Sequence, residues 1–272
     1  MLEVVDKNIL DILDHLPISI SKENLIFLGY RGSISHNTYV PSTEENGIDD
    51  IDLVGVFFGP ADFYIGLGNA LKSSIEHKVL LDNKYYDCVF YEFRHFMSML
   101  LRGNPNIVPT VWVIPDHIIM MHSGFNEVVE NRRHFLGKQS LRDAFTGYAR
   151  KCELDMDPSR QAYEGYMGEK RKAVVNKYGF DTKNASHAVR LLTMCKEALE
   201  TGSMNVYRTK DRELLIDIKQ GKFKKDEITL MAKSILKEVD IAYDEYSFLP
   251  NFGNLTLAND IVKRILKQHL LK

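Results

Sequence analysis

The stretch GIDDIDLVGVFFGP, Gly47 to Pro60, places three carboxylates directly in front of an apolar run. The run from Leu53 to Phe58 contains no polar side chain, and Gly59-Pro60 ends it, which predicts a buried strand. An acidic cluster usually lies in a solvated loop, whereas this one leads straight into a strand of the core. The rest of the predicted fold is arranged around this strand.

Asp50 and Asp52 are two residues apart, so an extended chain directs both side chains to one face, roughly 6.5–7 Å apart. At the edge of a low-dielectric core the two carboxylates repel each other, and each tends to protonate unless they share a cation. Mg²⁺ prefers hard oxygen ligands and is typically held by one or two carboxylates together with substrate phosphates. The spacing therefore predicts a metal site at Asp50 and Asp52, and it sets Asp49 aside because that side chain points to the opposite face. Taken alone, such a motif is more often a solvent-facing loop.

Asp87 is the third carboxylate in the predicted site. It interrupts the strand-like run KYYDCVFYEF, where an acidic residue is unfavourable. Taken alone, such a residue is more often hydrogen-bonded at a strand edge. If its strand lies beside residues 51–58, three carboxylates could hold two ions about 3.5–4 Å apart, the arrangement of a two-metal site.

A Gly-Ser turn precedes the acidic strand. Gly32-Ser33 follows the predicted strand 24–30, and a turn of this kind before a helix offers backbone N–H groups and a hydroxyl to phosphate oxygens. Gly-Ser alone is a common turn dipeptide. The order of strand, Gly-Ser, Asp-x-Asp on a second buried strand and a later strand Asp is far more specific than any one of its parts.

Helix and strand patterns divide the chain into a mixed front half and a helical back half. Residues 1–136 predict strands at 24–30, 51–58 and 117–121, a hairpin at 74–93 that turns at Asp82-Asn83, and helices at 4–16, 93–101 and 125–135. After about residue 136 strand signals nearly vanish, and helices are predicted at 141–153, 169–177, 185–200, 211–219, 226–246 and 255–271. We therefore expect two modules, residues 1–136 and 137–272, which pack together because no flexible linker separates them.

The formal net charge of −2 conceals opposite charges in the two halves. Residues 1–136 contain 10 Lys and Arg against 18 Asp and Glu, and residues 137–272 contain 25 against 19, so the balances are −8 and +6. Either two solvated surfaces differ by chance, or an acidic metal site faces a basic surface that receives an anionic substrate. No apolar run approaches the roughly 18–20 residues of a membrane span, and the three scattered cysteines favour a reducing cytoplasm.

The motif GYRGS…DDIDLVGV resembles the signature of the DNA polymerase β nucleotidyltransferase superfamily, in which a Gly-Ser turn precedes Asp-x-Asp. One branch is indicated by further stretches: DCVFYEFRHFMSMLLRGNPNIVPTVWV, FTGYARK, FDTKNASHAVRLL, ETGSMNV and SFLP. These are similar to the nucleotidyltransferases associated with RNA ligases and RNA repair, which are also common in phages. The resemblance extends from about Asn24 to Pro250. It implies an α+β fold, with a polymerase-β-like catalytic domain and mixed sheet at 1–136 and an all-helical domain at 137–272 that contributes to nucleotide and acceptor binding.

The resemblance also implies roles for single residues. Lys183, His187 and Arg190 match a K-x-x-x-H-x-x-R run, whose spacing puts all three on one helix face, as suits a triphosphate or a nucleic-acid backbone. Without the resemblance, this pattern is equally well interpreted as a solvated basic helix face. By the same comparison the catalytic metal ligands are Asp50, Asp52 and Asp87, and the nucleotide-binding residues are Gly32, Ser33, Lys183, His187 and Arg190.

The chain departs from its relatives just after the Gly-Ser turn. Relatives often carry an Arg and, three residues later, a Gly, where this chain has Ile34 and Asn37. Asn tolerates the left-handed conformation that Gly would supply, so we expect the turn to be kept. The missing Arg removes one phosphate contact, for which Arg31 could substitute.

The function implied by the resemblance is a nucleotidyltransferase that uses Mg²⁺ or Mn²⁺. It would transfer NMP from an NTP, with ATP or CTP favoured, to an acceptor hydroxyl and release pyrophosphate; an RNA 3′ end, tRNA included, is the first choice of acceptor. The alternatives are nucleotidylation of a protein or small molecule, or a non-catalytic nucleotide- or RNA-binding protein. The expected location is the cytoplasm of a bacterium or of a phage-infected host cell, with no membrane partner.

Overall fold

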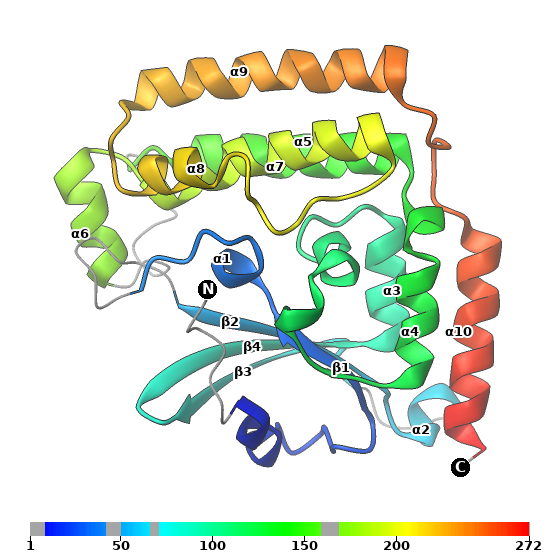
Figure 1. The fold of residues 1–272 in the computed structure, drawn as a ribbon. Coiled ribbons are helices and arrows are strands. Elements are labelled where there is room, and N and C mark those ends of the chain that lie inside the picture. Colours follow the sequence, from blue (N-terminus) through cyan, green and yellow to red (C-terminus); the bar gives the residue numbers. More distant parts are fainter. Residues whose placement is uncertain (1–8, 42–49, 66–70, 159–168, 272) are drawn as a thin grey trace.

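The structure, a computed structural model, describes residues 9–41, 50–65, 71–158 and 169–271, and its centre is a single five-stranded sheet (Figure 1). Most helices lie on one side of this sheet, and a short N-terminal 3₁₀ helix lies on the other (Figure 1). The mixture of sheet and segregated helices confirms the predicted α+β class. Within the described part of the chain, no helix has both the length and the apolar character needed to cross a bilayer.

The five strands run in the order β3-β4-β2-β1-β5. β2 and β4 are parallel, whereas β1 pairs antiparallel with both β2 and β5, and β3 pairs antiparallel with β4. The sheet is therefore mixed, as predicted. The strand bounds are β1 Leu25–Tyr30, β2 Ile51–Phe57, β3 Ser74–Leu81, β4 Lys84–Glu92 and β5 Ile118–Met121.

The hairpin β3–β4 turns where the sequence predicts it. Asp82 and Asn83 have φ of 49° and 60°, the two left-handed residues that a tight hairpin turn requires and that Asp and Asn tolerate. β4 ends at Glu92, whose carboxylate accepts hydrogen bonds from the backbone N–H of Arg94 and His95 and so begins the next helix. That helix, α3, spans Phe93–Leu101.

The remaining helices of the front half are short. The N-terminal segment Ile9–His15 is a 3₁₀ helix in which Ile9 and Ile12 are buried; their spacing of three matches the three residues per turn of a 3₁₀ helix. The rest of the predicted helix 4–16, up to residue 8, lies outside the described residues. The predicted helix 125–135 is divided into α4 and a 3₁₀ turn. The elements are α1 Gly32–Ser35, α2 Ala61–Tyr64 and α4 Ser123–Glu130, with 3₁₀ turns at Val108–Trp112, Pro115–His117 and Arg132–Phe135.

The back half is helical, as predicted, and α7 is its central element. α7 is buried over most of its length and packs against α5, α8 and α9. The predicted helix 226–246 ends as an α-helix at Ile241 and closes with one π turn, Ala242–Tyr246. The helix bounds are α5 Lys138–Asp155, α6 Glu169–Tyr178, α7 Thr182–Thr201, α8 Arg212–Lys219, α9 Lys225–Ile241 and α10 Leu255–Leu270.

The two halves share one hydrophobic core. A single cluster of buried residues contains Phe27 and Phe96 from the front half together with Leu192 and Ile261 from the back half. In addition, α10 runs back along the front half and packs against α3 and α4 (Figure 1). The two halves therefore pack together, and the boundary between residues 136 and 137 stays a prediction.

Candidate active site

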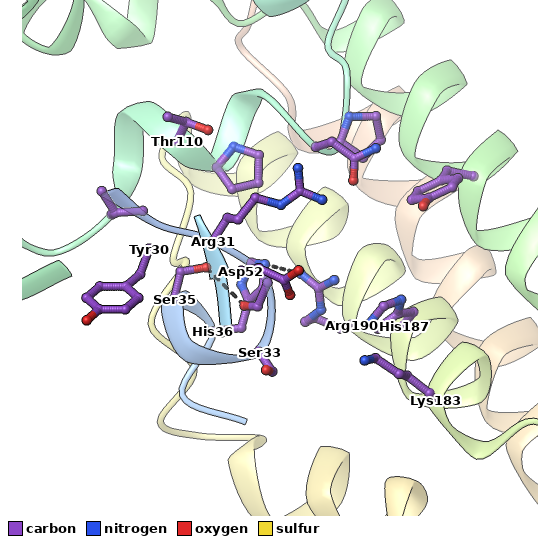
Figure 2. A pocket seen from close by; sticks show the side chains of 16 residues that line it. Tyr30, Arg31, Ser33, Ser35, His36, Asp52, Thr110, Lys183, His187 and Arg190 are labelled. Atoms are coloured by element: carbon purple, nitrogen blue, oxygen red, sulfur yellow. Dashed lines mark hydrogen bonds between the residues drawn. The ribbon is translucent and has the colours of Figure 1, made fainter. Parts of the chain in front are cut away.

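A cavity of about 210 Å³ lies where the end of β1 meets the start of β2, and α7 closes one side of it (Figure 2). Figure 2 shows Lys183, His187 and Arg190 reaching it from one helix, opposite the turn that carries Ser33. The cavity therefore brings together residues from both halves of the chain. Its lining residues are Tyr30, Arg31, Gly32, Ser33, Ser35, His36, Asp52, Pro105, Asn106, Pro109, Thr110, Val113, Tyr148, Lys183, His187 and Arg190.

The Gly-Ser turn is pressed against Asp52. Gly32 has φ of 63°, and a Cβ atom there would lie 2.3 Å from Asp52 Oδ2, so both the backbone conformation and the close approach require glycine. The backbone N–H of Arg31 donates to the Asp52 carbonyl at 2.9 Å and ties the turn to β2. Ser33, the next residue, is buried in the same wall of the cavity.

Asn37 supplies the left-handed residue that the turn needs after α1. Its φ is 57°, which confirms the expectation that Asn can stand where relatives carry Gly. Its side-chain amide also donates to the carbonyl of Arg208 at 2.9 Å, a contact that a glycine could not make. The substitution therefore keeps the turn and adds a link to the helical half.

The three predicted metal carboxylates lie at the same edge of the sheet but in different surroundings. Asp52 and Asp87 are directly opposite each other on the parallel strands β2 and β4, which meets the condition under which Asp87 could join the site. Asp87 makes an ion pair with Lys78 at 3.1 Å, and Asp50 is exposed just before β2. Of the three, only Asp52 lines the cavity. In residues 9–41, 50–65, 71–158 and 169–271, no three His, Cys, Asp or Glu side chains are close enough to hold one ion, so a metal role for this set stays a prediction.

The electrostatics of Asp52 fit a cation ligand. Burial raises the pKa of its carboxyl above the ordinary value, the charges of Arg31 and Lys183 lower that pKa, and those of Asp50 and Asp87 raise it again. A hard divalent cation beside these oxygens would relieve both the burial and the mutual repulsion. The chemistry of these oxygens is that of ligands for a hard divalent cation, and the identity of the ion stays a prediction.

The basic face of α7 is fixed at its first turn. The Asp181 carboxylate caps the helix by accepting from the backbone N–H of Lys183 and Asn184, each at 3.0 Å, and Arg171 pairs with it at 2.7 Å. This cap sets the orientation from which Lys183, His187 and Arg190 all face the cavity. The predicted common face is confirmed.

Arg190 is a buried cation whose hydrogen-bond partners, among the residues that the structure describes, are a His and a Met. Its side chain is 9% exposed, and its guanidinium donates to His36 Nε2 and, at 3.7 Å, to Met194 Sδ. Within the described chain it makes no ion pair with a carboxylate, and burial lowers its pKa to about 10. Because it remains charged at neutral pH, and a buried charge costs several kcal/mol unless it is paired, the site suits an anionic ligand.

Several residues of the cavity escaped the sequence prediction. Five of them lie in GNPNIVPTVWV and one in FTGYARK, stretches that carried the resemblance without any assigned role: Pro105, Asn106, Pro109, Thr110, Val113 and Tyr148. His36 had no signal in the sequence, because its partners lie about 150 or more residues away on α7 and in the segment before α8. Arg31 lines the cavity, and its role as a substitute for the missing Arg stays a prediction.

Comparison with known proteins identifies a family. A sequence profile of the RNA repair pathway DNA polymerase beta family matches residues 22–249, a range that includes every predicted site residue. No curated protein is significantly similar to the chain. Among solved structures, a nucleotidyltransferase-like protein from Exiguobacterium sibiricum 255-15 matches with 11% identity and a TM-score of 0.30; the match covers 82% of this chain and 72% of that one.

Proposed function

Because the chain belongs to the RNA repair pathway DNA polymerase beta family, and is therefore a nucleotidyltransferase that transfers NMP from an NTP, we propose that the reaction takes place in the cavity between β2 and α7. One observation carries the proposal. The cavity combines the Gly32-Ser33 turn, the Asp52 carboxylate and the cationic face of α7, although α7 begins 130 residues after Asp52 in the sequence.

The walls of the cavity suit a triphosphate. Arg31, Lys183 and Arg190 contribute three positive charges, whereas Asp52 is the one carboxylate among the described residues that line it. Ser33 adds a hydroxyl beside the backbone of the turn, and hydrogen bonds from cationic donors to phosphate oxygens are among the strongest in proteins. Burial and the charge of Arg190 lower the pKa of His187, so its imidazole is neutral at neutral pH and adds a further polar contact.

The metal would be held by Asp52 with Asp87 and Asp50, together with the phosphates. Bound there, Mg²⁺ or Mn²⁺ would supply charge neutralisation of the triphosphate and a lower pKa for the attacking hydroxyl. The chain's own contribution is to hold Asp52 in place: the N–H of Arg31 fixes its backbone, and Gly32 leaves room for its carboxylate.

The chemistry is an in-line displacement at the α-phosphorus of the NTP. The acceptor oxygen forms a bond to that phosphorus, the bond to the β-phosphate oxygen breaks, and pyrophosphate leaves. Lys183 and Arg190 on α7 would bind the departing phosphates and stabilise the negative charge that accumulates on them. Fixed charges of this kind, positioned before the reaction, usually account for most of the catalysis of phosphoryl transfer.

We propose an RNA 3′ end as the acceptor, and ATP or CTP as the donor. The RNA repair association of the family and the balance of +6 in residues 137–272 support the acceptor. Lys and Arg side chains on that half would neutralise backbone phosphates, and RNA binding should then weaken steeply as salt is raised.

The test is transfer of label from α-³²P-labelled ATP or CTP, with Mg²⁺, to RNA with an intact 3′ end or with a periodate-oxidised one. We expect label on the intact RNA only, and a loss of about 100-fold or more in Asp52→Asn, because a carboxylate that touches the reacting phosphates is removed. Asp62→Asn, an exposed carboxylate at the start of α2, is the matched control and should leave the rate unchanged.

Two results would overturn parts of the proposal. Label on the protein itself or on a small molecule, with none on RNA, would show that RNA is not the acceptor, and the assignment of the site would stand. An Asp52→Asn variant as active as the unmodified enzyme would remove the site assignment.

A further inference from the structure

His36 lines the cavity beside Arg190, at the contact between the two halves of the molecule. It follows α1 directly, it is 4% exposed, and both ring nitrogens have partners. Nδ1 lies 3.1 Å from the Val206 carbonyl, and Nε2 is hydrogen-bonded to Arg190 Nη1. The imidazole therefore bridges the segment before α8 and the guanidinium that faces the cavity (Figure 2).

The partners of His36 allow one protonation state. A carbonyl only accepts, so Nδ1 carries the hydrogen, and Nε2 must then be bare to accept from the guanidinium. Burial and the charge of Arg190 lower the pKa of His36 well below its ordinary value, which favours the same neutral form. The imidazole thus orients Arg190 without adding or removing charge.

We propose that His36 is a positioning residue that aims the Arg190 guanidinium into the cavity while leaving its positive charge for the triphosphate. The inference rests on the proposed function, since it takes the occupant of the cavity to be a triphosphate. A carboxylate in this position would orient the guanidinium equally well, but it would also neutralise the charge and compete with the phosphates. A neutral hydrogen-bond acceptor orients the guanidinium without neutralising its charge.

Further contacts around His36 connect the His36–Arg190 hydrogen bond to the Gly32-Ser33 turn. The His36 carbonyl accepts from the backbone N–H of Arg208 at 3.3 Å, and the Lys219 ammonium donates to the Thr38 carbonyl at 2.7 Å. Because His36 directly follows α1, the helix that Gly32-Ser33 begins, these contacts hold the turn and Arg190 in one rigid arrangement. The two sides of the cavity are thereby fixed relative to each other.

Three substitutions separate orientation from charge. His36→Gln keeps a neutral acceptor, His36→Leu removes it, and His36→Glu introduces a carboxylate. The readout is the Kd for inorganic tripolyphosphate, measured by calorimetry, together with KM and kcat for NMP transfer. The probe contains neither base nor acceptor, so it reports on the phosphate site alone.

We expect His36→Leu to weaken tripolyphosphate binding about 10-fold or more, because a hydrogen bond to a charged group is lost. His36→Gln should restore binding to within a few-fold of the unmodified enzyme, whereas His36→Glu should bind at least as poorly as His36→Leu. The matched control is Ser186→Ala, which removes a buried hydrogen bond from α7 to the Leu215 carbonyl without touching the guanidinium. It should not change the Kd.

Unchanged binding in His36→Leu would overturn the inference, as would unchanged binding in His36→Glu or an unmodified enzyme that does not bind tripolyphosphate. If His36→Leu does not fold, the comparison of Gln with Glu, which differ in charge at nearly equal size, decides the question. An enzyme that binds tripolyphosphate but transfers no NMP would refute the proposed function, and the pattern among the variants would still test His36.

Discussion

Two arginines are buried in the helical half, and their hydrogen-bond partners differ in charge. Arg208, 1% exposed, donates to both carboxylate oxygens of Glu197, at 2.5 and 2.8 Å, and to both of Asp211, each at 2.8 Å. These bonds outweigh burial and raise its pKa above the ordinary value. Arg190 has a neutral imidazole and a thioether instead, and burial lowers its pKa to about 10.

The difference separates a structural cation, Arg208, from one that we propose to bind a ligand, Arg190. A buried ion pair with complete hydrogen bonding is strongly destabilised when one partner is removed, because the other charge is left buried. A buried cation without a carboxylate is already unfavourable, and its retention favours a functional role. We therefore predict that the same substitution mainly lowers stability at Arg208 and mainly lowers activity at Arg190.

The largest effect is expected on stability at Arg208. Arg208→Met leaves Glu197 and Asp211 without their cation, and we expect a loss of about 3 kcal/mol in the free energy of unfolding. Urea denaturation measures it. The control is Arg142→Met, which breaks an ion pair with Asp240 at the surface and should cost less than about 1 kcal/mol. Equal losses in the two variants would contradict the structural role.

The same substitution at Arg190 should act on the reaction. We expect Arg190→Met to lower kcat/KM for NMP transfer about 100-fold, equivalent to about 2.7 kcal/mol, because a cation facing the phosphates is lost. Its free energy of unfolding should stay within about 1 kcal/mol of the unmodified enzyme, since removal of an unpaired buried charge offsets the lost hydrogen bond. If Arg190→Met were strongly destabilised and kept its kcat/KM, Arg190 would be a structural residue like Arg208.

The smallest effect concerns pH. Folding depresses the pKa of His36, so the unfolded chain binds a proton near pH 6.5 that the folded chain does not, and stability falls as pH drops through that range. His187 and His117 have depressed pKa values for the same reason of burial and contribute the same sign.

Between pH 6.5 and 5.5, the depressed pKa of His36 should lower the free energy of unfolding by about 1 kcal/mol. His36→Gln should reduce the loss of stability by this amount, measured as unfolding curves at the two pH values. An identical loss in the variant and the unmodified enzyme would show that His36 does not titrate on unfolding.

Local patterns were sufficient for all five strands, for most of the longer helices and for part of the site, but not for α2 or the short 3₁₀ turns. The two-residue period of the acidic strand selected Asp50 and Asp52, of which only Asp52 lines the cavity. The Asp82-Asn83 pair located the hairpin turn, and the spacing on α7 gave the common face of Lys183, His187 and Arg190. Each of these depends on residues within one turn or one strand, where the chain geometry alone relates the side chains.

Contacts between distant segments could not be found in this way. The partners of His36 are more than 150 residues away, and nothing in the local sequence distinguishes its ring from an exposed one. The same holds for the two arginines, because Arg190 and Arg208 differ in their partners and not in their burial. Asp87 required the additional knowledge that β4 lies beside β2, which the structure supplies.

The bonds around residues 36–38 bear on how substrate enters. Separating the turn from the helical half would break the hydrogen bonds of His36 to Val206, of Asn37 and His36 to Arg208, and of Lys219 to Thr38. At roughly 1 kcal/mol each, and with a core shared by both halves, a hinged opening at this contact is unfavourable. The proposed phosphate site is therefore preorganised, and binding there would lose little conformational entropy. Discrimination between ligands then depends on the shape and charge of a rigid wall.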